Sequence, residues 1–263
     1  MPKVSVIMSV YNDEKFVAQS IEGVLNSTYT DFEFIICNDC STDGSSEIIK
    51  KYKDKRIIFF SNGQNQGLAK SLNNCIERAK SEYIMRIDSD DICLPDRMEK
   101  QVAYLDEHKD IAMCGTFAQV IDNSNNNVYI LQRPIDVTVK DIFKNNSFIH
   151  PSVMIRKEIL DSVGCYVSKK ETRRAEDFDL WCRIYEAGFK GKNISEILIN
   201  YREDFSSYKK RKFRYRVDVY KLMKQWRKKL GLPLRYKFYA FKILLVGLIP
   251  KNLLYKMKKG KSK

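Results

Sequence analysis

The chain has few residues that could bind zinc or form a disulfide framework. Its 263 residues include only two histidines, His108 and His150, and neither has zinc-finger spacing to a cysteine pair. The seven cysteines are odd in number and scattered, and Cys37 and Cys40 form a lone CxxC. This pattern indicates reduced thiols in a cytosolic protein.

Long hydrophobic runs are also lacking, and we expect no secretory leader. Met1 leads directly into a strand-like run, without the basic segment and apolar core of a signal peptide. The longest apolar stretch, within residues 238–254, is interrupted by Lys242 and Pro250 and falls short of the roughly 20 residues that a spanning helix needs. We therefore expect a cytoplasmic protein without a membrane span.

Acidic residues are nearly absent from the end of the chain. The formal net charge is +14. Residues 205–263 hold 20 Lys and Arg against one acid, Asp218, whereas residues 1–204 hold 27 basic and 32 acidic residues. We expect a slightly acidic domain over residues 1–204 and a basic tail over residues 205–263. An anionic membrane surface or nucleic acid is the expected partner of the tail.

What the sequence does contain is an alternation of strand-like and helix-like segments. At 44% hydrophobic and 12% aromatic residues, it can bury a core. Short apolar runs predict strands at 4–10, 32–37, 57–60 and 83–87, and helical periodicity predicts helices at 16–25, 43–52 and 67–79. Strands that alternate with helices indicate an α/β fold with a mostly parallel central sheet flanked by helices.

Beyond residue 110 the pattern is looser. It predicts strand-like pieces within residues 111–131, around an Asn-rich turn, a strand at 148–155 and a helix at 175–187. In the tail, residues 213–230 predict an amphipathic helix, and residues 238–254 predict a helix lying in a membrane interface with Lys and Arg on anionic headgroups. The alternative is that both helices pack on the domain and expose a solvated basic face.

Three polar clusters follow predicted strands, at residues 9–14, 38–43 and 88–91. An open parallel sheet binds ligands at the carboxyl ends of its strands. In the third cluster Asp88, Asp90 and Asp91 repel one another and call for a hard cation, Mg²⁺ or Mn²⁺, which is usually shared with substrate phosphates. The sequence therefore predicts a nucleoside diphosphate ligand at this edge.

Other acids and one histidine have two interpretations each. Asp39 either caps the helix that follows or accepts the N–H of a pyrimidine. Glu176 and Asp177 either complement a helix dipole or supply a general base. His150 is either structural or in contact with metal or diphosphate. Residues 166–174, rich in Lys and Arg, are a candidate lid or phosphate clamp.

Taken together, these segments resemble inverting glycosyltransferase family 2, which has the GT-A fold, over residues 3–204. The resemblance is strongest to bacterial enzymes that build O-antigen or capsular repeat units on a lipid carrier. The motifs that carry it, in order, are VSVIMSVYNDEKFVAQSIEGVLNSTYTDFEFIICNDCSTDGS at 4–45, NQGLAKSLN at 65–73, YIMRIDSDD at 83–91, HPSVMIRKE at 150–158 and AEDFDLWCRI at 175–184.

The resemblance implies a role for each matching residue. Asp177 would be the catalytic base, and Asp90, with His150 nearby, would hold the metal, Mn²⁺ or Mg²⁺, on the donor diphosphate. The implied substrate-binding residues are Val10, Tyr11, Glu14, Asp39, Lys70, Asp88, Ser89 and Glu176, with Asp39 on the uracil. The chain departs from the family pattern at Ser9, Asn38 and Cys40, and Cys40 stands where relatives have a glycine that tolerates positive φ.

The resemblance implies an inverting, metal-dependent transfer of a hexose, glucose or galactose, from a UDP-sugar to a sugar on undecaprenyl diphosphate. The enzyme would be held at the inner face of the cell membrane by its tail. Two rivals remain. A nucleic-acid-binding protein would explain the basic tail but not the carboxylates at strand ends, and a nucleotidyltransferase would want a Gly-rich loop that residues 9–16 lack. We expect no nucleic acid partner.

Overall fold

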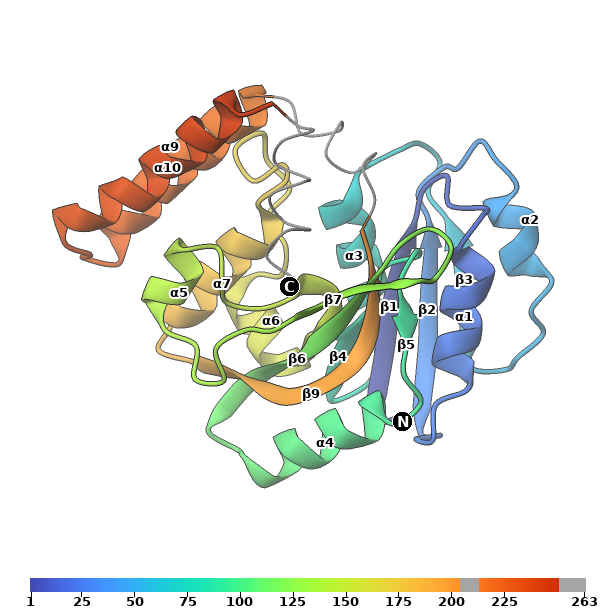
Figure 1. The fold of residues 1–263 in the computed structure, drawn as a ribbon. Coiled ribbons are helices and arrows are strands. Elements are labelled where there is room, and N and C mark those ends of the chain that lie inside the picture. Colours follow the sequence, from blue (N-terminus) through green and yellow to red (C-terminus); the bar gives the residue numbers. More distant parts are fainter. Residues whose placement is uncertain (204–212, 251–263) are drawn as a thin grey trace.

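The computed structural model describes residues 1–203 and 213–250, which form one mixed sheet covered by helices (Figure 1). The strands are β1 (Val4–Val10), β2 (Phe32–Asn38), β3 (Ile57–Ser61), β4 (Tyr83–Arg86), β5 (Ile92–Cys93), β6 (Ile111–Ile121), β7 (Asn127–Leu131), β8 (Met154–Arg156) and β9 (Lys190–Arg202). The helices are α1 (Val17–Leu25), α2 (Ser45–Lys50), α3 (Leu68–Ile76), α4 (Arg97–Glu107), α5 (Val139–Phe143), α6 (Lys157–Val163), α7 (Glu176–Glu186), α9 (Phe213–Lys229) and α10 (Lys237–Leu248), with short 3₁₀ turns at His150–Ser152 and Leu234–Tyr236.

The first half of the sheet is parallel, as the sequence predicted. The strand order is β3-β2-β1-β4-β8-β6-β9-β5, with β7 on β6, and β3, β2, β1 and β4 run parallel. Both faces of β1 are buried: Val6 packs in one apolar cluster and Ile7 in the other. Burial on two faces explains why these strands are continuous apolar runs rather than alternating ones.

The second half of the sheet is mixed, which the sequence did not predict. Strand β8 pairs antiparallel with β4 and β6, and β5 pairs antiparallel with β9. The predicted strand at 148–155 is wrong over most of its length, because His150–Ser152 is a 3₁₀ turn and only Met154–Arg156 pairs. Pro151 explains this difference, since it has no N–H for a strand ladder.

The two C-terminal helices form a hairpin beside α7 (Figure 1). The apolar face of α9 packs on the rest of the protein, where Leu222, Met223 and Trp226 are buried in one cluster with Trp181. For α9 the structure therefore favours the alternative of packing over a membrane-facing apolar side. The predicted domain boundary at 204/205 and the end of the 238–254 segment lie outside the described residues.

Replacing Trp226 by alanine is expected to lower the free energy of unfolding by about 3–5 kcal/mol. The indole is 6% exposed, and its Nε1–H donates to Asp179 Oδ1 at 2.9 Å. The change leaves both a cavity and a buried carboxylate oxygen without its donor. Urea denaturation would measure the loss, with Gln225→Ala on the exposed side of the helix as control. A loss under about 1 kcal/mol would contradict the packing of α9 on the protein.

Candidate functional site

The first two polar clusters meet where β1 and β2 end. The N–H of Asn12 donates to Ser41 Oγ at 3.1 Å, and the N–H of Thr42 donates to Asn12 Oδ1 at 2.8 Å. Glu14 Oε2 accepts the N–H of Gly44 at 2.8 Å. Because β1 and β2 are parallel neighbours, their carboxyl ends and the loops that follow share one edge of the sheet.

The residues predicted to contact the nucleotide are not all free to do so. Tyr11 is half exposed and presents a ring to solvent, whereas the side chain of Val10 has no exposed surface and packs in the core. Any contact of Val10 with a ligand would therefore use its backbone, whose carbonyl already accepts the N–H of Asp39 at 2.8 Å. Glu14 is occupied in holding the 41–44 loop, and Lys70 is exposed on α3.

Asp39 stabilises a different helix from the one expected. Its carboxylate is buried, and it accepts the N–H of Gln66 on Oδ1 and the N–H of Gly67 on Oδ2, both at 2.8 Å. Asn62 adds a third hydrogen bond at 2.8 Å. Asp39 thus caps the segment leading into α3 rather than α2, and its contact with a pyrimidine stays a prediction.

Cys40 adopts the positive φ that a glycine would be expected to adopt at this position. Its φ is +62°, in the left-handed region that favours glycine. The turn therefore keeps the shape that a glycine would give, at a cost of roughly 1 kcal/mol for the β-carbon. The substitution does not remove the geometry of the 38–43 loop, because Ser41 N still donates to Asn38 Oδ1 at 3.1 Å.

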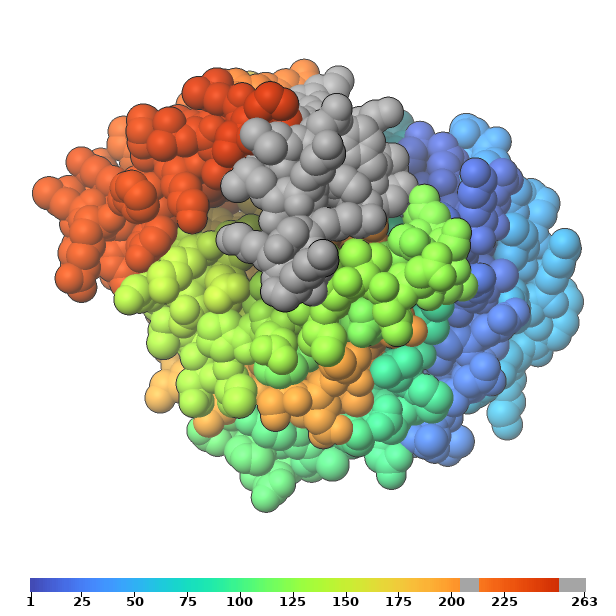
Figure 2. All heavy atoms as spheres, in the orientation of Figure 1, coloured from blue at the N-terminus to red at the C-terminus, as the bar shows by residue number. Residues whose placement is uncertain are grey.

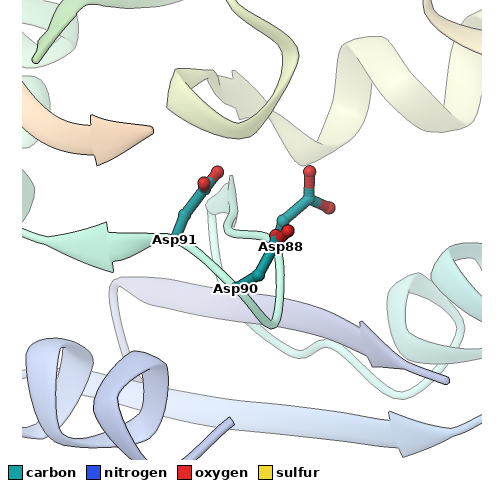
Figure 3. A group of neighbouring side chains, drawn as sticks. All are labelled: Asp88, Asp90 and Asp91. Atoms are coloured by element: carbon teal, nitrogen blue, oxygen red, sulfur yellow. The ribbon is translucent and has the colours of Figure 1, made fainter. Parts of the chain in front are cut away.

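The third cluster is a group of three carboxylates on the turn between β4 and β5 (Figure 3). Asp88, Asp90 and Asp91 each offer an oxygen within 4.8 Å of the others. Burial, followed by the charges of Asp88 and Asp13, raises the pKa of Asp90 to about 7. Burial and the charges of Asp90 and Asp88 raise the pKa of Asp91 well above its ordinary value.

These carboxylates fit a hard divalent cation. Within the described residues the buried Oδ2 of Asp91 has no hydrogen-bond partner, although its Oδ1 accepts the backbone N–H of Arg202 at 2.8 Å. The positive charge of a divalent ion would offset the repulsion among three close carboxylates, and oxygen ligands select Mg²⁺ or Mn²⁺. Ser89, expected to bind substrate, is buried instead and donates to Asp13.

A second pair of acids opens α7. Glu176 and Asp177 lie in its first turn, and Asp177 Oδ1 accepts the N–H of Phe178 at 2.7 Å. Burial and the charge of Asp177 raise the pKa of Glu176 to about 7, and burial raises the pKa of Asp177 as well. Asp179, the third acid of this turn, is structural, because Arg183 and Trp226 occupy its two oxygens.

Arg86 joins the two acidic groups, and the sequence prediction missed it. Its buried guanidinium forms an ion pair with Asp88, and its positive charge partly offsets the rise that burial causes in the pKa values of Glu176 and Asp177. Its Nε and Nη1 have no hydrogen-bond partner within the part of the chain that the structure describes. The signal was present in the sequence: a cation inside the apolar strand 83–87 must be paired when it is buried.

His150 is not part of the carboxylate group. Its Nε2 lies 2.8 Å from the hydroxyl of Tyr166, and its ring packs edge-on against Trp181 at 5.7 Å between centroids. Burial and the charge of Arg86 lower the pKa of His150 well below its ordinary value, so the ring is neutral. The structure thus supports the structural interpretation of His150 more than the predicted contact with metal.

Replacing Glu176 by glutamine is expected to stabilise the metal-free protein at pH 8 by an amount on the order of 2 kcal/mol. The folded state holds a proton on Glu176 up to about pH 7, whereas the unfolded state releases it near 4.5. Stability therefore falls as pH rises through this window, and the glutamine variant escapes the loss. Urea denaturation at pH 5 and pH 8 measures it, with exposed Glu107→Gln as control. An equal difference at both pH values would contradict the shifted pKa.

Comparisons with known proteins agree with the resemblance in the sequence. The model of the family described as glycosyl transferase family 2 matches residues 5–164. The putative glycosyltransferase EpsE of Bacillus subtilis (strain 168) is 40% identical over 253 residues, which cover 95% of this chain and 90% of EpsE. The UDP-Glc:alpha-D-GlcNAc-diphosphoundecaprenol beta-1,3-glucosyltransferase WfaP of Escherichia coli is 30% identical over 81% of this chain and 82% of its own length.

Solved structures confirm the predicted GT-A fold. The crystal structure of S. aureus TarS 1–349 in complex with UDP-GlcNAc matches with a TM-score of 0.72 and 21% identity, over 94% of this chain and 71% of that chain. The mannosyltransferase PcManGT of Pyrobaculum calidifontis, in complex with GDP-Man and Mn²⁺, matches with a TM-score of 0.64 and 15% identity, over 98% of this chain and 80% of that chain. At these identities the likeness concerns the fold.

Proposed function

The chain belongs to glycosyltransferase family 2, and from this premise we propose that it transfers a hexose from a UDP-sugar to a hydroxyl of a sugar carried on a lipid diphosphate. Glucose or galactose is the favoured hexose, in the synthesis of an O-antigen, capsule or exopolysaccharide. The observation that supports the proposal is the position of Arg86. Its guanidinium forms an ion pair with Asp88 in the carboxylate group, and its positive charge also acts on Asp177 at the start of α7.

The donor side of the proposal rests on the edge formed by β1, β2 and β4. Tyr11 offers an exposed ring for the nucleotide base. Asp90, together with its neighbours in the carboxylate group, would hold Mn²⁺ or Mg²⁺. The ion would neutralise charge on the donor diphosphate. The complex of TarS with UDP-GlcNAc and that of PcManGT with GDP-Man and Mn²⁺ are consistent with this use of the fold.

The acceptor side rests on α7. Asp177 would take the proton of the attacking hydroxyl, because a carboxylate with a raised pKa is a stronger base at neutral pH. Attack on the face of the anomeric carbon opposite to UDP inverts its configuration and gives a β-linkage. Glu176, beside it, would contact the acceptor. WfaP acts on a sugar linked to diphosphoundecaprenol, and we extend that class of acceptor to this chain.

Release of UDP by the purified full chain tests the proposal. UDP-Glc, UDP-Gal, UDP-GlcNAc, UDP-GalNAc and GDP-Man would each be offered with synthetic GlcNAc- or GalNAc-diphospholipids, with Mn²⁺ and with EDTA. We expect metal-dependent release from one UDP-sugar with one acceptor. Transfer from GDP-Man alone would refute the UDP donor, and equal rates with Mn²⁺ and EDTA would refute the metal.

We further propose that the α9–α10 hairpin holds the enzyme on the inner face of the cell membrane. No helix within the described residues is long and apolar enough to cross a bilayer. The hairpin projects at one side of the molecule (Figure 2), and its α10 exposes four large apolar side chains in a basic region, namely Phe238, Phe241, Leu245 and Leu248. Exposed apolar groups beside Lys and Arg suit an anionic lipid surface.

Replacing Phe238 and Phe241 by serine is expected to weaken binding to phosphatidylglycerol vesicles at least tenfold, because each ring loses burial worth roughly 2 kcal/mol. Vesicle flotation measures the change. Ile130→Ser with Ile135→Ser, at exposed apolar positions away from the hairpin, is the matched control. Equal binding by both double variants would refute the surface, and tight binding to RNA in place of vesicles would favour the nucleic-acid rival.

A further inference from the structure

A cavity of about 620 Å³ lies outside the carboxylate site, between residues 170–173 and the start of α9. Three cations line it: Lys170, Arg173 and Arg214. Phe213 and Val217 add apolar wall. The proposed roles of Asp90 and Asp177 use none of these residues.

Two of the cations converge on one hydroxyl group. Arg214 Nη2 donates to Tyr215 Oη at 3.2 Å, and its guanidinium carbon lies 5.0 Å from the centre of the Tyr215 ring. Hydrogen bonds from Arg214 and from Arg173 lower the pKa of the Tyr215 hydroxyl. The cavity therefore brings together two guanidinium groups that are far apart in the sequence.

The positive charge of this cavity exceeds the negative charge. Within residues 1–203 and 213–250, neither Lys170 nor Arg173 nor Arg214 forms an ion pair with a carboxylate, and Asp218 is the acid in the lining. Three cations held together against one acid favour an anion. Guanidinium groups match phosphate oxygens in particular, because their planar forks donate paired hydrogen bonds.

The cavity also lies at the right place along the chain. Asp177 follows Arg173 by four residues, and an extended chain of four residues spans at most about 14 Å. In the lipid-linked acceptor proposed above, the diphosphate is attached to the sugar whose hydroxyl attacks the donor. A diphosphate near Arg173 would thus leave its sugar within reach of the base on α7.

The wall of the cavity reaches α10. A β-carbon added to Gly247 of α10 would lie 2.9 Å from the ring of Phe213, so the two helices touch at this point. Leu248, next to Gly247, is exposed, whereas Leu245 lies two residues before Gly247 and therefore on the opposite side of α10. Phosphate-binding cations near an exposed leucine suit a lipid that carries a diphosphate at its end.

We propose that the cavity between residues 170–173 and α9 binds the diphosphate of the lipid-linked acceptor. This inference rests on the proposed function, since it assigns the acceptor class of that same site. Arg173 and Arg214 hold the phosphate oxygens, and Leu248 receives the first part of the lipid chain.

Calorimetry on the full chain with farnesyl diphosphate and with farnesol tests the binding. We expect the diphosphate to bind more tightly than the alcohol, and Arg173→Gln with Arg214→Gln to raise its Kd roughly 10- to 100-fold. UDP binding should change less than twofold. Lys221→Gln with Lys228→Gln, which removes the same charge from the exposed side of α9, should leave both affinities unchanged. Equal weakening by the two double variants, or equal affinity for farnesol, would overturn the proposal.

Two further measurements distinguish a failure of this inference from a failure of the proposed function. If transfer fails with every acceptor, the proposed function falls, while the farnesyl diphosphate measurement still decides whether the cavity binds that group. If transfer occurs, the arginine double variant should lose kcat/KM with a GlcNAc-diphospholipid and keep it with an alkyl GlcNAc glycoside. An equal loss on both would overturn the assignment. The assignment would also be overturned if the arginine double variant bound farnesyl diphosphate normally but no longer bound phosphatidylglycerol vesicles. The cavity would then bind a lipid headgroup.

Discussion

The Asp177→Asn enzyme is expected to bind UDP and metal as the unaltered enzyme does, and to transfer sugar roughly a thousandfold more slowly. Asn has the size of Asp but cannot accept a proton. The amide oxygen can still accept the N–H of Phe178, which Asp177 Oδ1 accepts at 2.7 Å, so the start of α7 keeps its geometry. The loss should therefore appear in kcat, whereas the Kd of UDP stays within about twofold.

Glu186→Gln is the matched control for this prediction, because it removes the same charge from the other end of α7, where Glu186 pairs with Lys229 on the surface. Calorimetry with UDP and Mn²⁺, together with UDP release in the presence of acceptor, gives both quantities. Normal turnover by Asp177→Asn would refute the assignment of the base. If Glu176→Gln alone abolished transfer, the base would be its neighbour.

The parallel part of the fold was predictable because its signal is local. Strands such as β1 and β2 are buried on both faces, so their apolar runs stand out in the sequence. Strand β9 (Lys190–Arg202) carries only a three-residue apolar run, at 197–199, and it pairs with β6, about 80 residues earlier. Pairing over that distance depends on tertiary contacts that periodicity does not report.

The candidate site likewise has a part that the sequence predicted and a part that it did not. The acidic clusters could be placed at one edge of the sheet, because parallel strands bring their carboxyl ends together. The position of Arg202 beside this edge could not be predicted, because Arg202 comes from the end of β9, far along the sequence. Its Nε donates to the backbone carbonyl of Asp90 at 2.8 Å. The tail shows the converse. Amphipathic periodicity identified α9, but periodicity alone does not say whether protein or lipid covers the apolar face.

The Asp90→Asn enzyme is expected to lose transfer by about three orders of magnitude for a different reason, since it should no longer bind metal with UDP. Asp90 shares its turn with Asp88 and Asp91, whose oxygens lie within 4.8 Å of it. A neutral amide lowers the charge that attracts a divalent ion. Manganese binding, followed by electron paramagnetic resonance with and without UDP, should weaken at least a hundredfold, with exposed Asp136→Asn as control.

Stability gives Asp90→Asn a second readout that is independent of turnover. Burial and neighbouring charges raise the pKa of Asp90 to about 7, so above that pH its ionised form destabilises the folded, metal-free protein. The neutral amide removes this cost, and the variant should melt at a higher temperature than the unaltered protein at pH 8 without metal. It should also show no rise in Tm on adding Mn²⁺, whereas Asp177→Asn should show the full rise. A metal-induced rise in Asp90→Asn equal to that of the unaltered protein would place the ion elsewhere.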